Sequence, residues 1–285
     1  MSTNEQIKTI LHEIENGQAV PYLGPGALAG CHSSEGDAPM PADSDSLILA
    51  MNNGRPMAPK LMFEFPRAAM NLELKKGRSF ITRFLTGLYG EKTWTRAPLH
   101  DWIAKIKPGY VIDINRDTQL QDSYAGTPHT LIRGIARIGG TDYRFQIHSY
   151  DGETYTEIEQ DAVDPTLPVL FKPTGSPLPE PTYLASDADF VDYITELMGG
   201  FAIPTFLKEK RKGLKYVLLG MRLTRDTERM VMSDITYDAP EHRGWALIPD
   251  ATDKEKRFCA KVGLEIVDTG VDDLLATSPI LEAAS

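Results

Sequence analysis

The sequence of 285 residues lacks the features that mark several large classes of protein. No apolar run reaches the roughly eighteen residues of a transmembrane helix. Only two cysteines are present, Cys31 and Cys259, and neither belongs to a C-x-x-C pair. This scarcity argues against a disulfide framework and against a structural zinc site, so we expect no metal. Because the first residues are polar and no signal sequence is recognisable, we expect a cytoplasmic protein without a membrane partner.

Positive charge is also scarce, since the chain has 30 lysines and arginines but 40 acidic residues, which gives a net charge of −10. This balance disfavours nonspecific nucleic-acid binding, which depends on neutralising phosphates. One segment is basic, in contrast to the acidic balance of the whole chain. A basic cluster there predicts a docking patch for an acidic partner or a phosphate, and a solvated helix end with its loop is the alternative. Its members are Lys208, Lys210, Arg211, Lys212 and Arg222, with Lys215, Arg225 and Arg229 nearby.

Common catalytic motifs are missing as well. The chain has no H-E-x-x-H, G-x-S-x-G or Walker sequence. His129 and His148 fall in segments that alternate like strands, where a lone histidine is more often packed or on the surface than catalytic. His32 and His100 are weaker candidates still. No catalytic residue is therefore expected from motifs alone.

The chain does contain an apolar strand that runs into a Gly-Pro-Gly turn at residues 19–28. Gly24 and Gly26 would let backbone N–H groups approach a pyrophosphate closely, as in dinucleotide-binding turns. A tight connection without a ligand is the alternative, because many strands end in glycine.

The order of elements predicts an α/β fold: a Rossmann-like parallel sheet flanked by helices, with a helical segment and a small antiparallel β insert. The final third alternates strand 215–219, helix 226–235, strand 244–248, helix 252–261 and strand 263–267. We expect a single domain over residues 1–285. Within it, residues 29–97 would form a long loop plus a helical module. Residues 127–160 would form the antiparallel insert, with a hairpin turn at Gly139–Gly140.

Segments in this order resemble the SIR2-like (sirtuin-fold) family. The match covers roughly residues 6–268, and the strand and turn at 20–28 are similar to the family's nucleotide loop. Pro98-Leu-His and the segment 111–120 are similar to its helix, strand and Thr-Asn-x-Asp-x-x-Leu element. Residues 170–176 stand at its Lys-Leu-His-Gly motif, and residues 216–226 at its Phe-x-Gly-x-Ser turn. The resemblance implies that Gly24, Gly26, Asn115, Asp117 and Gly220 are the residues that would contact NAD.

The departures from the family pattern point away from catalysis. Leu28 and Arg222 replace cofactor-facing serines, and Thr174 stands where the family has its catalytic histidine. A threonine hydroxyl does not titrate near neutral pH and cannot replace imidazole as a general base. Asn115 and Asp117 are the main polar residues of the family pattern that this chain retains, and they are the only weak catalytic candidates. A structural role at the strand–helix turn is the alternative for both.

The leading hypothesis is a catalytically degenerate, non-enzymatic SIR2-like protein that binds a partner protein and needs no cofactor. The chain also resembles SIR2-like proteins associated with nitrogen-fixation systems. That resemblance implies an assembly or protective factor, chaperone-like in character, that docks on the nitrogenase molybdenum–iron protein. Two alternatives remain open: a sensor that binds NAD without turnover, and an NAD hydrolase or deacylase that uses Asn115.

Overall fold

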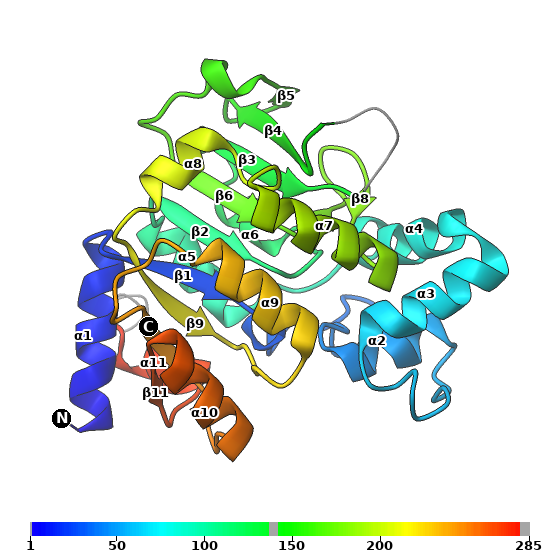
Figure 1. Ribbon diagram of the computed structural model, residues 1–285, viewed down its shortest axis with the longest axis horizontal. Coiled ribbons are helices and arrows are strands. Elements are labelled where there is room, and N and C mark those ends of the chain that lie inside the picture. Colours follow the sequence, from blue (N-terminus) through cyan, green and yellow to red (C-terminus); the bar gives the residue numbers. More distant parts are fainter. Residues whose placement is uncertain (1, 137–141, 280–285) are drawn as a thin grey trace.

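The computed structural model describes residues 2–136 and 142–279. In these ranges the core is a nine-stranded sheet with the strand order β11-β10-β9-β1-β2-β6-β3-β4-β5 (Figure 1). All neighbours from β11 to β3 pair in parallel, and β4 and β5 add antiparallel pairs at one edge. The strands are β1 (Ala19–Leu23), β2 (Tyr110–Asp113), β3 (His129–Gly134), β4 (Phe145–Tyr150), β5 (Tyr155–Glu157), β6 (Val169–Lys172), β9 (Lys215–Leu219), β10 (Gly244–Leu247) and β11 (Leu264–Val267). The predicted mostly parallel α/β fold is confirmed.

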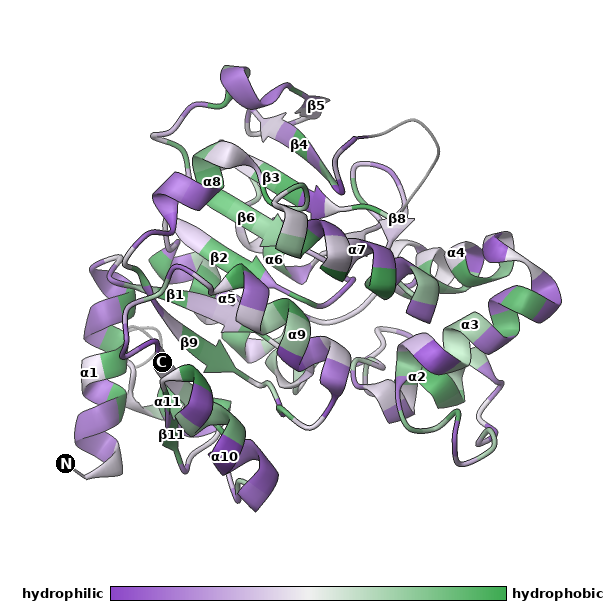
Figure 2. Cartoon of the chain, viewed as in Figure 1, coloured by the Kyte–Doolittle hydropathy of each residue, from purple (hydrophilic) through white to green (hydrophobic). Residues whose placement is uncertain are grey.

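Helices cover both faces of this sheet. Val20 and Tyr22 of β1 pack into one core layer and Ala19 and Leu23 into the other, as alternating strand side chains require. The first layer includes residues of α7 (Asp187–Gly199), α8 (Thr205–Lys210), α9 (Asp226–Ile235) and α10 (Asp253–Val262). The second includes residues of α1 (Thr3–Glu15), α5 (Pro98–Ile106), α6 (Gln119–Ser123) and α11 (Val271–Thr277). Figure 2 shows hydrophobic residues along β3, β6 and β9 and hydrophilic residues along much of α10.

A third core belongs to the helical module predicted at residues 29–97. Buried residues of α2 (Ser44–Met51), α3 (Phe65–Lys76) and α4 (Arg78–Thr86) pack together there with Leu28 and Cys31. A π-helical turn, η2 (Gly87–Glu91), continues α4, and the turn after β1 is a 3₁₀ helix, η1 (Pro25–Leu28). Figure 1 shows the module beside the sheet, next to α7 and α9. None of the helices described has the length and apolar character needed to cross a bilayer.

The antiparallel strands expected at residues 127–160 are present, but they do not form a separate insert. β3 pairs in parallel with β6, so β3, β4 and β5 extend the main sheet. Sequence patterns identify the β3–β4 hairpin but not the inner neighbour of β3, because that neighbour, β6, follows β5 in the chain. The predicted Gly139–Gly140 turn lies outside the described residues. The separate two-stranded sheet is instead β7 (Gly175–Ser176) with β8 (Thr182–Tyr183), and a short 3₁₀ turn, η3 (Gln160–Ala162), follows β5.

Candidate functional site

The glycine turn lies where the order of the sheet reverses. The chain leaves β1 toward β2 on one side and leaves β9 toward β10 on the other, so the loops after β1 and β9 diverge at the carboxyl edge. Such a switch point is the usual ligand crevice of open parallel sheets. Gly24 and Gly26 meet Gly220 here, although almost two hundred residues separate them in the sequence.

These glycines are packed against one another. The Gly26 amide donates to the Gly220 carbonyl oxygen at 2.7 Å, and the Gly24 amide donates to the Leu219 carbonyl oxygen at 2.9 Å. Gly220 has φ of +68°, and a Cβ on it would lie 2.3 Å from the Ala27 nitrogen. The two loops could not approach this closely with side chains in place. The amides of Gly24 and Gly26 are already engaged, so neither is free to bind a phosphate.

Asn115 and Asp117 hold the loop after β2 in place. The Asn115 Nδ2 donates to the Gly24 carbonyl oxygen and to Asp113 Oδ1, both at 2.9 Å. Asp117 Oδ1 accepts the Gln119 amide at 2.8 Å at the start of α6. This is the structural role that sequence reasoning left as the alternative. Burial raises the pKa of Asp117 to about 6, and its Oδ2 has no partner among the described residues.

A buried ion pair beneath the turn was not anticipated from the sequence. Lys172 Nζ lies 2.6 Å from Asp113 Oδ2, and both side chains are fully buried. His100 is adjacent: its ring and the carboxylates of Asp113 and Asp117 bring ligand atoms within 4.8 Å of one another. Asp113 already accepts from Asn115 and Lys172, so the lysine supplies the positive charge that a metal ion would bring. The sequence signal for this ion pair was a lysine in an otherwise apolar strand, because lysine is rarely buried unless it is paired.

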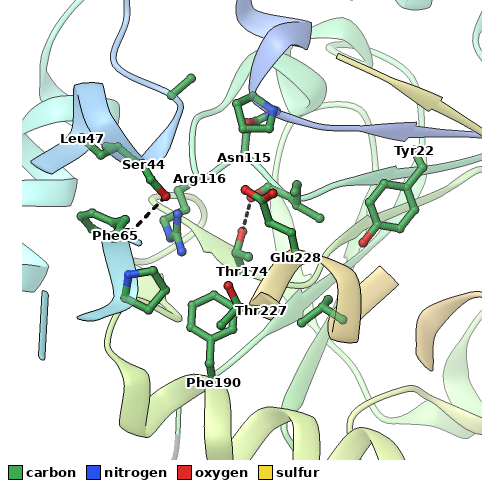
Figure 3. A pocket seen from close by; sticks show the side chains of 15 residues that line it. Tyr22, Ser44, Leu47, Phe65, Asn115, Arg116, Thr174, Phe190, Thr227 and Glu228 are labelled. Atoms are coloured by element: carbon green, nitrogen blue, oxygen red, sulfur yellow. Dashed lines mark hydrogen bonds between the residues drawn. The ribbon is translucent and has the colours of Figure 1, made fainter. Parts of the chain in front are cut away.

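An inner chamber of about 50 Å³ opens at the carboxyl ends of β1 and β2 (Figure 3). Its polar lining includes Asn115, Arg116, Thr174 and Glu228. Thr174, at the position matched to the family's histidine, donates its hydroxyl to the Ile114 carbonyl oxygen at 2.7 Å. Burial, reinforced by the nearby Glu64 carboxylate, raises the pKa of Glu228 to about 8, so this carboxyl is mostly protonated at neutral pH. Neither Arg116 nor Glu228 was singled out in the sequence.

An outer cleft of about 580 Å³ adjoins the chamber, and Pro25, Ala42, Ser44 and Glu228 line both. The cleft lies between the loop after β1, the start of α2 and the loop after β9. Leu28 and Arg222, which stand where the resembled family has serines, also line the cleft and leave this volume open. The switch point therefore keeps space for a ligand although the glycine amides are engaged.

No histidine lines the chamber or the cleft within the described residues. Burial lowers the pKa values of His100, His129 and His148 to about 4, so all three are neutral at pH 7. His129 contacts the Thr127 carbonyl oxygen and the Tyr155 hydroxyl in the β3–β5 region, away from the switch point. Cys31 does line the cleft, but burial raises its pKa to about 11, so it is a thiol at neutral pH.

The predicted basic patch is not one continuous surface, and this expectation is corrected. Lys208, Lys210, Arg211 and Lys212 lie in or just after α8 before β9 begins, whereas Arg222 follows the other end of β9. Arg211 is buried against Asp238 and the Ile235 carbonyl oxygen, and Lys208 donates to the Gly200 carbonyl oxygen. Lys212 pairs with Glu209 at 2.6 Å, and the Arg222 guanidinium binds both oxygens of Glu255 at 2.9 Å. Four of these five cations therefore have a hydrogen-bond or ion-pair partner within the protein, although Lys212 and Arg222 remain exposed.

Comparison with protein-family models finds no match for the chain, and comparison with curated proteins finds no similar one.

Proposed function

We propose that this chain is a SIR2-like protein without catalytic activity that works by binding another protein. The observation that supports the absence of catalytic activity is the hydrogen bond from Thr174 to the Ile114 carbonyl oxygen in the inner chamber. At the position matched to the family's general base, the hydroxyl is committed to the backbone and cannot accept a proton near pH 7. His129 and His148 support the same conclusion, because neither lines the chamber or the cleft and burial lowers the pKa of each to about 4, which makes it a weak base.

The proposed partner is the nitrogenase molybdenum–iron protein, and the proposed role is assembly, protection or repair of that protein. The resemblance to SIR2-like proteins of nitrogen-fixation systems, a group that includes the nitrogenase-associated factor T, motivates this choice. An exposed apolar strip on the outer side of α7 is compatible with protein docking. Val191 and Met198, seven residues apart on one helix face, are 67% and 77% exposed, and Phe201, just after the end of α7, is 47% exposed.

The test uses the full-length protein with an affinity tag in cells grown under nitrogen-fixing conditions. We expect nitrogenase subunits to be recovered with it, and the purified molybdenum–iron protein to co-elute with it. Met198→Glu would weaken the complex if α7 docks, while Leu74→Glu on α3, at 75% exposure, is the matched control. Failure to recover any nitrogenase subunit, together with no co-elution of the purified proteins, would refute the proposed partner.

A second candidate is a sensor that binds a nucleotide such as NAD without turnover. The specific observation in its favour is the 580 Å³ cleft at the switch point, which Leu28 and Arg222 line without closing. Calorimetry with NAD and ADP-ribose tests this, and no heat at millimolar ligand would eliminate it. An NAD hydrolase is tested in the same samples. Consumption of NAD that is lost in Asn115→Ala would instead support the enzyme.

A further inference from the structure

Arg116 is a buried cation without a carboxylate partner in the described ranges. Its residue surface is 8% exposed, and it lines the inner chamber. Its Nε donates to the Leu184 carbonyl oxygen at 2.8 Å, and the guanidinium lies 5.2 Å from the centre of the Phe65 ring (Figure 3). Neither terminal nitrogen has a hydrogen-bond acceptor among residues 2–136 and 142–279. Buried guanidinium groups are normally paired with an anion, because an isolated buried charge is costly.

The acidic groups nearest to Arg116, Asp189 and Glu228, interact with it electrostatically but form no ion pair with it. Asp189 is already paired with Arg78 and accepts two backbone amides at the start of α7. Glu228 forms no ion pair with Arg116, and its carboxyl is mostly protonated at pH 7 because burial raises its pKa to about 8. Burial lowers the pKa of Arg116 to about 10, which still leaves it positively charged. Among the described residues that line the chamber, the one acidic group is therefore this mostly protonated carboxyl, which lies with the charged Arg116 guanidinium.

We propose that the inner chamber binds the carboxylate group of a small organic acid, with Arg116 as its cationic anchor. The planar guanidinium matches a planar carboxylate through two parallel N–H donors. About 50 Å³ is space for a few heavy atoms, since one water needs on the order of 10–15 Å³ by the same measure. A carboxylate has three heavy atoms, and a tetrahedral phosphate is bulkier. The protonated Glu228 carboxyl supplies a further donor to the anion.

The body of the ligand would lie in the outer cleft. Pro25, Ala42, Ser44 and Glu228 line both spaces, so a group anchored at Arg116 points its substituent toward the larger volume. The partner is thus an organic acid larger than acetate. This site is independent of the proposed docking on nitrogenase, because it faces the switch point and not the outer side of α7. Failure of either proposal leaves the other standing.

The experiment titrates the full-length protein at pH 7 with propionate, succinate and inorganic phosphate, followed by amide chemical shifts. We expect saturable binding of both carboxylates, with shifts at residues of the chamber. Arg116→Gln is expected to weaken binding at least tenfold. Arg55→Gln, an exposed arginine of the same helical module that does not line the chamber, is expected to change affinity less than twofold.

A second variant keeps the proposal testable if Arg116→Gln does not fold. Ala42 is half-buried at the junction of the two spaces, and Ala42→Leu would block entry without removing a buried charge. It is expected to abolish succinate binding. No saturable carboxylate binding to the wild type, equal affinity in Arg116→Gln, or phosphate binding tighter than succinate would each overturn the proposal.

Discussion

Removal of Lys172 should be one of the most destabilising single substitutions at the candidate site. Its ammonium lies 2.6 Å from Asp113, and neither side chain has any exposed surface. Lys172→Met preserves most of the side-chain volume but leaves Asp113 with only its hydrogen bonds from Asn115. Breaking a buried ion pair by removing one partner costs about 3–5 kcal/mol, and the remaining hydrogen bonds place this case near the lower value.

The size of the expected effect follows from the length of the chain. Unfolding entropy of about 2 cal/mol/K per residue gives roughly 0.6 kcal/mol/K here, so a loss of about 3 kcal/mol lowers Tm by about 5 °C. Urea denaturation followed by circular dichroism measures the free energy directly. Lys172→Met combined with Asp113→Asn should recover part of the loss, because the double variant no longer buries an uncompensated carboxylate.

Lys212→Met is the matched control, since Lys212 also lies 2.6 Å from a carboxylate, that of Glu209, but is 59% exposed. An exposed pair of this kind contributes below about 1 kcal/mol. If Lys172→Met loses less than about 1 kcal/mol, or no more than Lys212→Met, then Asp113 does not depend on the lysine and the reasoning is wrong.

Three further predictions concern the switch point. Gly220→Ala should lower the free energy of unfolding by more than about 2 kcal/mol, because a Cβ would lie 2.3 Å from the Ala27 nitrogen. Gly213→Ala, with φ of +73° and open space around it, should lower it by about 1 kcal/mol. Urea denaturation compares the two variants. Burial raises the pKa of Glu228 from 4.5 to about 8, so the folded protein holds a proton that the unfolded chain has lost, and stability should fall as pH rises through that window. Thermal melts at pH 5 and pH 8.5 should show a smaller difference in Glu228→Gln, and an unchanged difference would contradict the assignment. Asn115→Ala should lower the free energy of unfolding by about 2–3 kcal/mol, because it removes the hydrogen bonds to the Gly24 carbonyl oxygen and to Asp113. Urea denaturation measures this loss as well. Stability equal to that of the wild type would show that the turn does not depend on Asn115.

Local patterns were sufficient to predict the strands and helices of the final third. Glycines bracket the apolar run of β9, and the predicted 215–219 matches the strand as found. The helix predicted at 226–235 also matches α9. Short apolar strands alternating with helices leave few arrangements other than a parallel sheet, so the fold class followed from the same residues. The position of β3 beside β6 could not follow, because it depends on pairing between strands that are not consecutive.

The site itself was only partly predictable, since its chemistry depends on contacts between distant segments. Gly24, Gly26 and Gly220 were singled out and do meet, but their engagement with each other depends on how β1 and β9 are aligned. Arg222 was interpreted as a docking residue because Glu255, its partner on α10, is not adjacent in the sequence. Arg116 gave no signal, because an arginine in a loop is ordinary until its burial and its missing counter-ion are known.

The central position of β1 has a consequence for how the protein is made. Ala19 of β1 pairs with Lys215 of β9, so one edge of this early strand stays unpaired until most of the chain has left the ribosome. At about 5–20 residues per second, translation takes roughly 10–40 s to span that interval. During this time an apolar edge is open to pairing with other nascent chains. We therefore expect the yield of native protein to depend on chaperone capacity during synthesis more than on the stability of the finished fold.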